Sequence, residues 1–250
     1  MSENQTDNMG AGQRAEDIAC WYLRLNGFML TDGFVVHPEK IRSDSAQVTE
    51  ADIYGVRFPY SQERYGITEI RELIDDGDAN GMDLFRGFHT EKNIPLFILV
   101  EVKSWLTKIN GPWSSPEKKA MQTVISRMGC LPPDAVNSAA ISMYENLYYE
   151  CSSCVIQYIT IGAVLDKDLS IRYPKLKQIS FKHISEFFYD RFRMFPEKIS
   201  KDKANAHKSW PKFLCRFGYE VTANGSIRSP AKANEFFRRY IDCGLIDDPQ

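Results

Sequence analysis

The decapeptide PLFILVEVKS, residues 95–104, joins an unbroken run of five apolar residues to two opposite charges separated by one valine. A run of this length between Pro95 and the polar residues after Lys103 is typical of a strand buried on both faces. Side chains alternate along a strand, so we expect Glu101 and Lys103 on one face and Val102 on the other. A carboxylate and an ammonium at the end of a buried strand are costly unless they are paired or bound to a metal. This strand end is therefore where we expect the chemistry of the protein.

The composition is that of a soluble globular chain, with 250 residues, 43% hydrophobic residues and a formal net charge of −2. No apolar run approaches the roughly 20 residues that a membrane helix needs. The polar N-terminus lacks the apolar core of a secretory signal. Six scattered cysteines in such a chain are expected to be reduced thiols, which indicates a cytoplasmic protein without membrane contact. We expect residues 1–9 to be a disordered tail.

The near-neutral total hides an uneven charge distribution. Residues 172–240 hold 16 Lys and Arg against 6 Asp and Glu, whereas residues 1–171 hold 15 against 24. The basic C-terminal third is a candidate surface for nucleic-acid phosphates. Within it we single out the lysines of a basic linker and of the segment that follows, Lys198, Lys201, Lys203, Lys208 and Lys212.

Hydrophobic periodicity and turn residues divide the rest of the chain into helices and strands. Helices are expected over residues 11–25, 116–128, 135–149 and 183–195, and further strands over 28–30, 33–36, 49–58, 155–165 and 178–181. Ser115 is expected to cap the second helix, with Pro116 at its first position. This order predicts an α/β class with a mixed central sheet flanked by helices. We expect this domain over residues 10–195 and a small basic extension over 196–250.

Two of the expected strands carry polar residues at positions i and i+2. One offers Glu50 and Asp52, and the other offers Glu101 and Lys103. If these strands pair, three carboxylates and a lysine converge at one end of the sheet. Such a site suits Mg²⁺, which takes one or two protein carboxylates and keeps waters for a substrate phosphate. A metal there could acidify a bound water, and Lys103 could orient that water or balance developing charge.

The pattern of Asp52 followed by Glu101–Val102–Lys103 at the end of an apolar strand resembles the PD-(D/E)xK nuclease superfamily. Glu16, in the first expected helix, looks like the helical glutamate of the Holliday-junction-resolvase-like members. The segment Glu50–Ala51–Asp52–Ile53 looks like their E-x-D-hydrophobic strand. Gln122 stands where many members carry Gln or Lys. The resemblance covers about residues 10–165.

The resemblance implies a restriction-endonuclease-like fold and Mg²⁺-dependent hydrolysis of phosphodiester bonds, with Mn²⁺ as a substitute. It implies DNA, more than RNA, as the partner. The metal ligands would be Asp52, Glu101, the carbonyl of Val102 and Glu50. The residues that assist catalysis would be Lys103, Glu16 and Gln122.

The sequence departs from the family pattern in two respects. Ala51 precedes Asp52, where proline is usual, and 49 positions separate Asp52 from Glu101, which predicts an insertion at about residues 60–94. Asp83 lies 18 positions before Glu101 and competes as the metal aspartate. We favour Asp52, because it lies in better strand sequence and has Glu50 two residues away.

Two other motifs have simpler interpretations. A second Glu-x-Lys, Glu117–Lys118–Lys119, follows Pro116 in an expected first helical turn, where a glutamate suits the helix dipole. Cys151–Ser152–Ser153–Cys154 is a single C-x-x-C, for which Cys130 could be a third metal ligand but no fourth is evident. Thiols without a metal are the simpler interpretation of these cysteines.

Two hypotheses follow from the sequence. The first is a metal-dependent endonuclease that acts on DNA. The second is a catalytically silent module of nuclease-like fold, whose basic C-terminal third binds nucleic acid or serves assembly. The structure and sequence of the substrate, the biological pathway, and a homodimer or a partner protein are left open.

Overall fold

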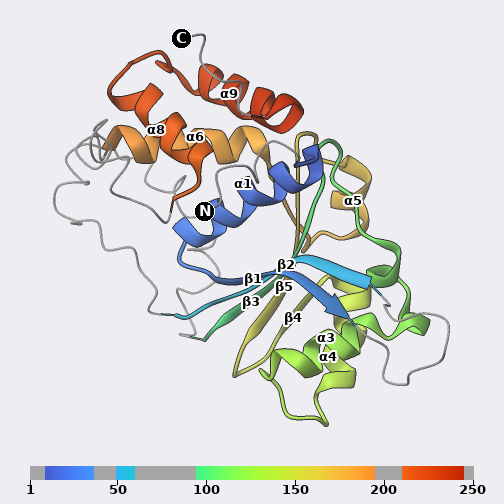
Figure 1. Cartoon of the computed structure of the whole chain (residues 1–250). Helices are drawn as coiled ribbons and strands as arrows, with labels where there is room; N and C mark the ends of the chain where they lie inside the picture. Colours follow the sequence, from blue (N-terminus) through green and yellow to red (C-terminus); the bar gives the residue numbers. More distant parts are fainter. Residues whose placement is uncertain (1–8, 37–48, 60–93, 195–209, 245–250) are drawn as a thin grey trace. The chain divides into compact units, whose positions relative to one another are not determined.

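The computed structural model describes residues 9–36, 49–59, 94–194 and 210–244 (Figure 1). Contacts divide the chain into two compact units, Ala19–Ile179 and Met1–Ile18 together with Ser180–Gln250. Nearly all of the expected tail and of the expected insertion, and the basic linker up to residue 209, lie outside the described residues. Within the described ranges, no helix has the length and apolar character that a membrane crossing requires.

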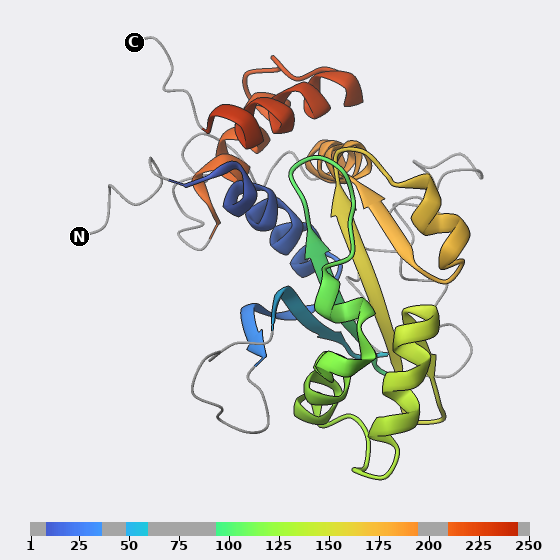
Figure 2. The same ribbon diagram turned by 90° about the vertical axis from the view of Figure 1, so that its right-hand side faces the viewer.

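A mixed six-stranded sheet forms the centre of the Ala19–Ile179 unit (Figures 1 and 2). The strands are β1 (Met29–Val36), β2 (Thr49–Arg57), β3 (Leu96–Val102), β4 (Tyr148–Glu150), β5 (Val155–Gly162) and β6 (Lys177–Ser180). Their order is β1-β2-β3-β5-β4, with β6 also paired to β5. The pairs β1–β2, β2–β3 and β4–β5 are antiparallel, whereas β3 and β5 run parallel. The expected mixed sheet flanked by helices is confirmed.

The two central strands are the most buried part of the sheet. Every residue of β5 is buried, and so is every residue of β3 except the half-buried Phe97. This confirms that the apolar run of the opening stretch is a strand covered on both faces. The expected strand 155–165 ends earlier, at Gly162, where a Cβ atom would lie 2.9 Å from the backbone oxygen of Trp105. The glycine is needed because the chain that leaves β3 crosses over this position.

Two helices, α3 (Ala120–Met128) and α4 (Val136–Asn146), pack against each other and against one face of the sheet (Figure 2). The 3₁₀ turns η2 (Gly111–Ser114) and η3 (Pro116–Lys118) precede them, and α5 (Lys167–Arg172) follows β5. The expected inward positions of α3 are correct, since Ala120, Met121, Val124 and Ile125 are buried. This face is the one that carries Leu99 and Tyr158.

Two expected helix boundaries are wrong. The helix expected from Pro116 begins at Ala120, because Lys119 adopts a left-handed conformation with φ 53°, and within this described loop the Ser115 side chain makes no capping hydrogen bond. The helix expected to reach Tyr149 ends at Asn146. Leu147 takes a φ of 56° there, and the next three residues form the edge strand β4.

The N-terminal helix α1 (Ala11–Leu25) has the bounds that its periodicity predicts. Its C-terminus is a Schellman motif, in which Gly27, with φ 83°, donates to Arg24 O at 3.0 Å and Phe28 donates to Leu23 O at 3.1 Å. The stop signal read from Gly27 is therefore confirmed. The first part of α1, up to Ile18, belongs to the unit that also contains the C-terminal helices.

That second unit contains α6 (Phe181–Met194), α8 (Lys212–Thr222) and α9 (Pro230–Cys243), which pack on one another (Figure 1). An aromatic cluster lies between them, with ring centroids of Phe188 and Phe237 5.3 Å apart and of Phe217 and Phe237 4.7 Å apart. Arg14 of α1 donates to the carbonyls of Ile241 and Asp242 at the end of α9, at 2.9 and 3.1 Å. The C-terminal segment of this unit begins at Ser180, directly before α6.

Candidate active site at the end of strand β3

The site lies where β2 and β3 diverge. The antiparallel ladder pairs Ile53 with Val100 and would next place Asp52 opposite Glu101. Beyond this pair the Asp52 side chain bonds to β3, because its Oδ2 accepts the backbone N–H of Val102 at 2.7 Å. A charge-assisted bond of this kind holds the carboxylate against the strand. The expected meeting of Asp52 with the Glu101–Val102–Lys103 strand is present in the structure.

Lys103 lies between the two carboxylates. Its Nζ donates a hydrogen bond to Glu101 Oε1 and lies 3.9 Å from Asp52 Oδ2. The side chains of Glu101 and Asp52 are 1% and 17% exposed, whereas that of Lys103 is 37% exposed. The ammonium therefore bridges the buried Glu101 and the half-buried Asp52 from the solvent side, and this pairing accounts for the charges at the end of the apolar strand.

Glu101 is the group whose protonation the site perturbs most. Burial and the neighbouring charge of Asp52 raise the pKa of Glu101 to about 7, although Lys103 and Tyr158 oppose this shift by stabilising the charged form. A carboxyl group with such a pKa changes charge near neutral pH. Perturbed carboxyl groups of this kind are concentrated at functional sites.

Strand β5 supplies two residues that the sequence analysis did not identify. Tyr158 donates from its hydroxyl to Glu101 Oε2 at 3.4 Å, and burial beside Glu101 and Asp52 raises its pKa well above the ordinary value, so the phenol stays a donor. Thr160 stands beside Glu101 in the parallel register and is fully buried. Its Oγ1 has no hydrogen-bond partner among the described residues.

The sequence predicted the strand that carries Tyr158 and Thr160, but it did not show which strand pairs with it. Val155–Gly162 is a β-branched and aromatic run, in which Tyr158 and Thr160 stand two positions apart. Side chains two apart share one face of a strand. Only the parallel register, which sets Glu101 opposite Thr160, shows that this face is the face of the site.

The donor set fits a hard divalent cation. Two carboxylates lie beside each other on neighbouring strands, with a buried hydroxyl of Thr160 next to them that lacks a partner in the described residues. Mg²⁺ takes one or two carboxylates and fills its remaining positions with water. The described residues contain no group of three or more His, Cys, Asp or Glu side chains that could hold a metal ion. A cation at this place would have the carboxylates of Asp52 and Glu101 as its protein ligands and would take water at its other positions.

Gln122 is directed toward α4. Its Oε1 accepts a hydrogen bond from the Tyr144 hydroxyl at 3.1 Å, and that hydroxyl oxygen accepts the backbone N–H of Met121 at 3.1 Å. The contact joins α3 to α4 across their interface. A role of Gln122 in positioning Lys103 or a phosphate stays a prediction.

The described contacts do not test three other expected residues. Glu16 is half-buried on α1, in the part of that helix that groups with the C-terminal unit. Glu50 pairs with Val35 in the β1–β2 ladder. Asp83 lies outside the described residues. Their roles stay predictions, as does that of the Val102 carbonyl.

The loop after Lys103 presents an exposed aromatic residue on a fixed backbone. Trp105 is 65% exposed, yet its carbonyl accepts the N–H of Val164 at 3.0 Å. Thr107 donates its N–H to Val164 O at 2.9 Å and accepts the N–H of Asp166 at 2.8 Å through Oγ1. These bonds hold the backbone of the loop against the segment that follows β5. The exposed indole of Trp105, two residues after Lys103, is therefore attached to a hydrogen-bonded backbone.

Comparison with known proteins adds no identification. No family model, no curated protein and no solved structure matches this chain. Membership of the PD-(D/E)xK superfamily therefore stays a prediction that rests on the sequence motif. The function is inferred from the residues of the site themselves.

Proposed function

We propose that this protein is a Mg²⁺-dependent nuclease of PD-(D/E)xK type that hydrolyses phosphodiester bonds in DNA. The observation that carries this proposal is the convergence of Asp52, Glu101 and Lys103 at the adjoining ends of β2 and β3. The mixed sheet agrees with the restriction-endonuclease-like fold that the motif implies. Two adjacent carboxylates with a partly exposed lysine would suit a cation that activates water for such chemistry.

Asp52 and Glu101 would hold the cation, with the Val102 carbonyl and Glu50 as further ligands and Mn²⁺ as a substitute. When bound, the cation would supply charge stabilisation at a phosphoryl oxygen and would lower the pKa of a bound water. Asp52 is already oriented for this role by the N–H of Val102 at 2.7 Å. Glu101 is oriented by Tyr158 and Lys103.

Lys103 would supply the cationic hydrogen-bond donor of the site. In the described arrangement its ammonium balances the two carboxylates. With a cation held by the two carboxylates, the Lys103 ammonium, which is the most exposed of the three groups, would be able to turn toward solvent. There it can donate to the attacking water or to the scissile phosphate, which are the roles expected of a positioned cationic donor.

The raised pKa of Glu101 links cation binding to protons. Because this pKa is about 7, the carboxyl group is partly protonated near neutral pH. A metal ligand must be deprotonated, so binding of a divalent cation would release a proton. We therefore expect the affinity for Mg²⁺ to increase as the pH rises through about 7.

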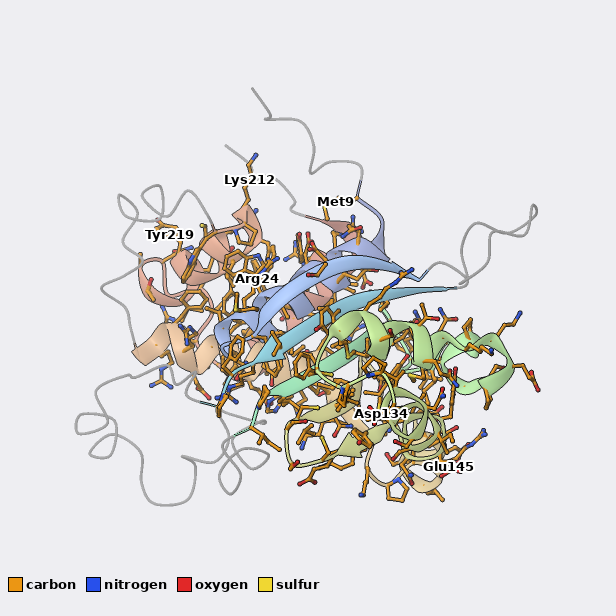
Figure 3. The ribbon with its side chains drawn as sticks, turned by 90° about the horizontal axis from the view of Figure 1, so that it is seen from below. Met9, Arg24, Asp134, Glu145, Lys212 and Tyr219 are labelled. Atoms are coloured by element: carbon orange, nitrogen blue, oxygen red, sulfur yellow. The ribbon has the colours of Figure 1, made fainter. Side chains whose placement is uncertain are left out.

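The helices of the C-terminal unit offer the phosphate contacts. Arg228, Arg238, Arg239 and Lys212 are exposed there, and the Lys212 side chain extends away from α8 (Figure 3). Other basic residues are committed to carboxylates, as in the Arg216–Glu220 pair at 3.0 Å. Neutralisation of DNA phosphates by such residues gives binding that weakens steeply with salt. The remaining expected lysines, Lys198, Lys201, Lys203 and Lys208, lie outside the described residues.

The test is cleavage of supercoiled plasmid DNA by the full chain with Mg²⁺, with Mn²⁺ and with EDTA. We expect nicked and linear products only with a divalent cation. Asp52→Asn and Lys103→Met should abolish them, because each removes a charge of the site and nearly preserves volume. Lys118→Met removes an exposed lysine of the second Glu-x-Lys and serves as the control.

Equal cleavage by the wild type, Asp52→Asn and Lys103→Met would contradict the proposal. DNA binding without cleavage under any divalent cation would instead support the silent binding module. DNA binding is measured separately from cleavage, by fluorescence anisotropy with a labelled duplex in EDTA at a series of salt concentrations. Because this measurement needs no turnover, it detects a binding module that does not cleave.

A further inference from the structure

A cluster of three thiols lies at the opposite end of β5 from the candidate active site. Cys151 and Cys154 flank the two-residue turn Ser152–Ser153 that joins β4 to β5. Cys151 donates its backbone N–H to Cys154 O at 3.0 Å, which extends the ladder beyond the pair Glu150 and Val155. The two Sγ atoms lie 3.9 Å apart, and all six cysteines of the chain are free thiols.

Cys130, which follows α3, brings the third thiol to this place. A hydrogen bond from the Cys154 thiol lowers the pKa of Cys130, and the same contact together with burial raises the pKa of Cys154. Cys154 is 1% exposed, whereas Cys130 and Cys151 are half-buried. The cluster therefore joins one buried cysteine to two half-buried ones.

The arrangement favours disulfide chemistry. Directly opposed residues of a hydrogen-bonded antiparallel pair have Cα atoms about 5.5 Å apart. This separation lies in the usual range for a disulfide, which needs its sulfurs at about 2.05 Å.

We propose that Cys130, Cys151 and Cys154 form a peroxide-reactive thiol site, in which Cys154 ends in a disulfide with one of its two neighbours. The thiolate of Cys130 attacks one oxygen of hydrogen peroxide. The O–O bond breaks, hydroxide leaves, and Cys130 becomes a sulfenic acid. The Sγ of Cys154 then attacks the Cys130 sulfur. The S–O bond breaks, and the oxygen leaves as water with the proton of the Cys154 thiol.

The step balances as a two-electron exchange. Two thiols are oxidised to one disulfide, and one peroxide is reduced to two waters. Cys151, at 3.9 Å from Cys154, can take over the bond by thiol–disulfide exchange, which returns Cys130 to the thiol. A thiol reductant reverses the whole sequence. The site is independent of the proposed nuclease function.

The experiment treats the full-length protein with hydrogen peroxide in EDTA, blocks the remaining thiols with an alkylating reagent, and maps disulfides by mass spectrometry without reduction. We expect two of the six thiols to be lost first, in a disulfide that contains Cys154, and to return with dithiothreitol. The exposed Cys243 is the internal control, because it is a free thiol on α9, which belongs to the other unit.

Two variants keep the test sharp. Cys154→Ser should lose the disulfide and accumulate sulfenic acid at Cys130 or Cys151, which dimedone traps, whereas Cys243→Ser should behave as the wild type. Thermal unfolding checks that each variant folds, and Cys154→Ala replaces Cys154→Ser if the buried hydroxyl prevents folding. Oxidation of Cys243 before the cluster, or oxidation of the cluster without a disulfide of Cys154, would overturn the proposal.

Discussion

The sequence Glu-x-Lys occurs twice in this chain, and its two copies have opposite environments. Glu101–Val102–Lys103 ends a central strand, where Glu101 is 1% exposed and hydrogen-bonded by Lys103 and Tyr158. Glu117–Lys118–Lys119 belongs to a 3₁₀ turn and the residue after it, where all three side chains are exposed.

The difference shows which structural environment the Glu-x-Lys motif requires in addition to its residue types. On a strand, positions i and i+2 share one face, so Glu101 and Lys103 meet each other and Asp52 of β2. In the turn, Lys119 has a left-handed backbone that ends η3, and the side chains of Glu117 and Lys119 are exposed. A buried acidic neighbour and a strand are thus the features that make the first copy a site.

Exchange of glutamate for glutamine in each copy gives the largest expected contrast. Glu101→Gln removes a proposed cation ligand, and we expect metal-dependent cleavage of plasmid DNA to fall by on the order of 10³-fold. Glu117→Gln changes an exposed side chain and should leave cleavage within a factor of about two. Gel analysis of both variants at equal concentration measures the contrast. Comparable losses in both would remove the distinction between the two copies.

The pH dependence of stability should also separate the copies. The pKa of Glu101 is raised from 4.5 to about 7 in the folded chain, so the native state holds its proton more tightly than the unfolded state. Its contribution to the free energy of unfolding is present below pH 4.5 and is lost as the pH rises to about 7. The loss amounts to about 3 kcal/mol.

We therefore expect Glu101→Gln to become more stable relative to the wild type as the pH rises across this window. Urea unfolding in EDTA at a series of pH values measures the difference. Glu117→Gln should differ from the wild type by less than about 0.5 kcal/mol at every pH. A difference between Glu101→Gln and the wild type that does not vary with pH would show that Glu101 is already ionised at the lower end.

The sequence predicted the strand end well because its signals are local. The apolar run before Glu101, the periodicity of α1 and the stop at Gly27 all act through neighbours within one or two turns. The edge strand β4 was missed, because Leu147 leaves the helix through a left-handed conformation that leucine rarely adopts. Tyr158 and Thr160 were missed because their role depends on the parallel register between distant segments.

The loop after Lys103, at the end of the first Glu-x-Lys copy, passes so close to Gly162 that this position needs a glycine. A matched pair of alanine substitutions can test this requirement. In Gly162→Ala the new Cβ would lie 2.9 Å from the backbone oxygen of Trp105, so the loop after Lys103 must shift. We expect a loss of about 1–3 kcal/mol in the free energy of unfolding. In Gly12→Ala the Cβ meets nothing within 4 Å and lies in α1, so stability should rise by up to about 1 kcal/mol. Chemical denaturation compares them, and equal effects would contradict the close approach.

The smallest expected effects concern two buried threonines near the ends of β3 and β5. Thr160, beside Glu101, has no hydrogen-bond partner for its hydroxyl among the described residues, whereas Thr107 accepts the N–H of Asp166 at 2.8 Å and donates to Gln178. A buried hydroxyl without a partner costs about 1 kcal/mol or more, and valine has nearly the same shape. Thr160→Val should therefore stabilise the metal-free protein by about 1 kcal/mol, and Thr107→Val should destabilise it by about as much.

The same pair tests whether the Thr160 hydroxyl serves a ligand of the site. If that hydroxyl faces a bound cation or its water, Thr160→Val should weaken Mn²⁺ binding, measured by calorimetry, by about 10-fold, even though the variant is more stable in EDTA. Thr107→Val should bind Mn²⁺ as the wild type does. Unchanged binding in Thr160→Val would assign that hydroxyl to the core. A gain in stability combined with weaker binding would show that a polar group beside Glu101, which has no counterpart beside Glu117, is kept for the ligand at a cost to the fold.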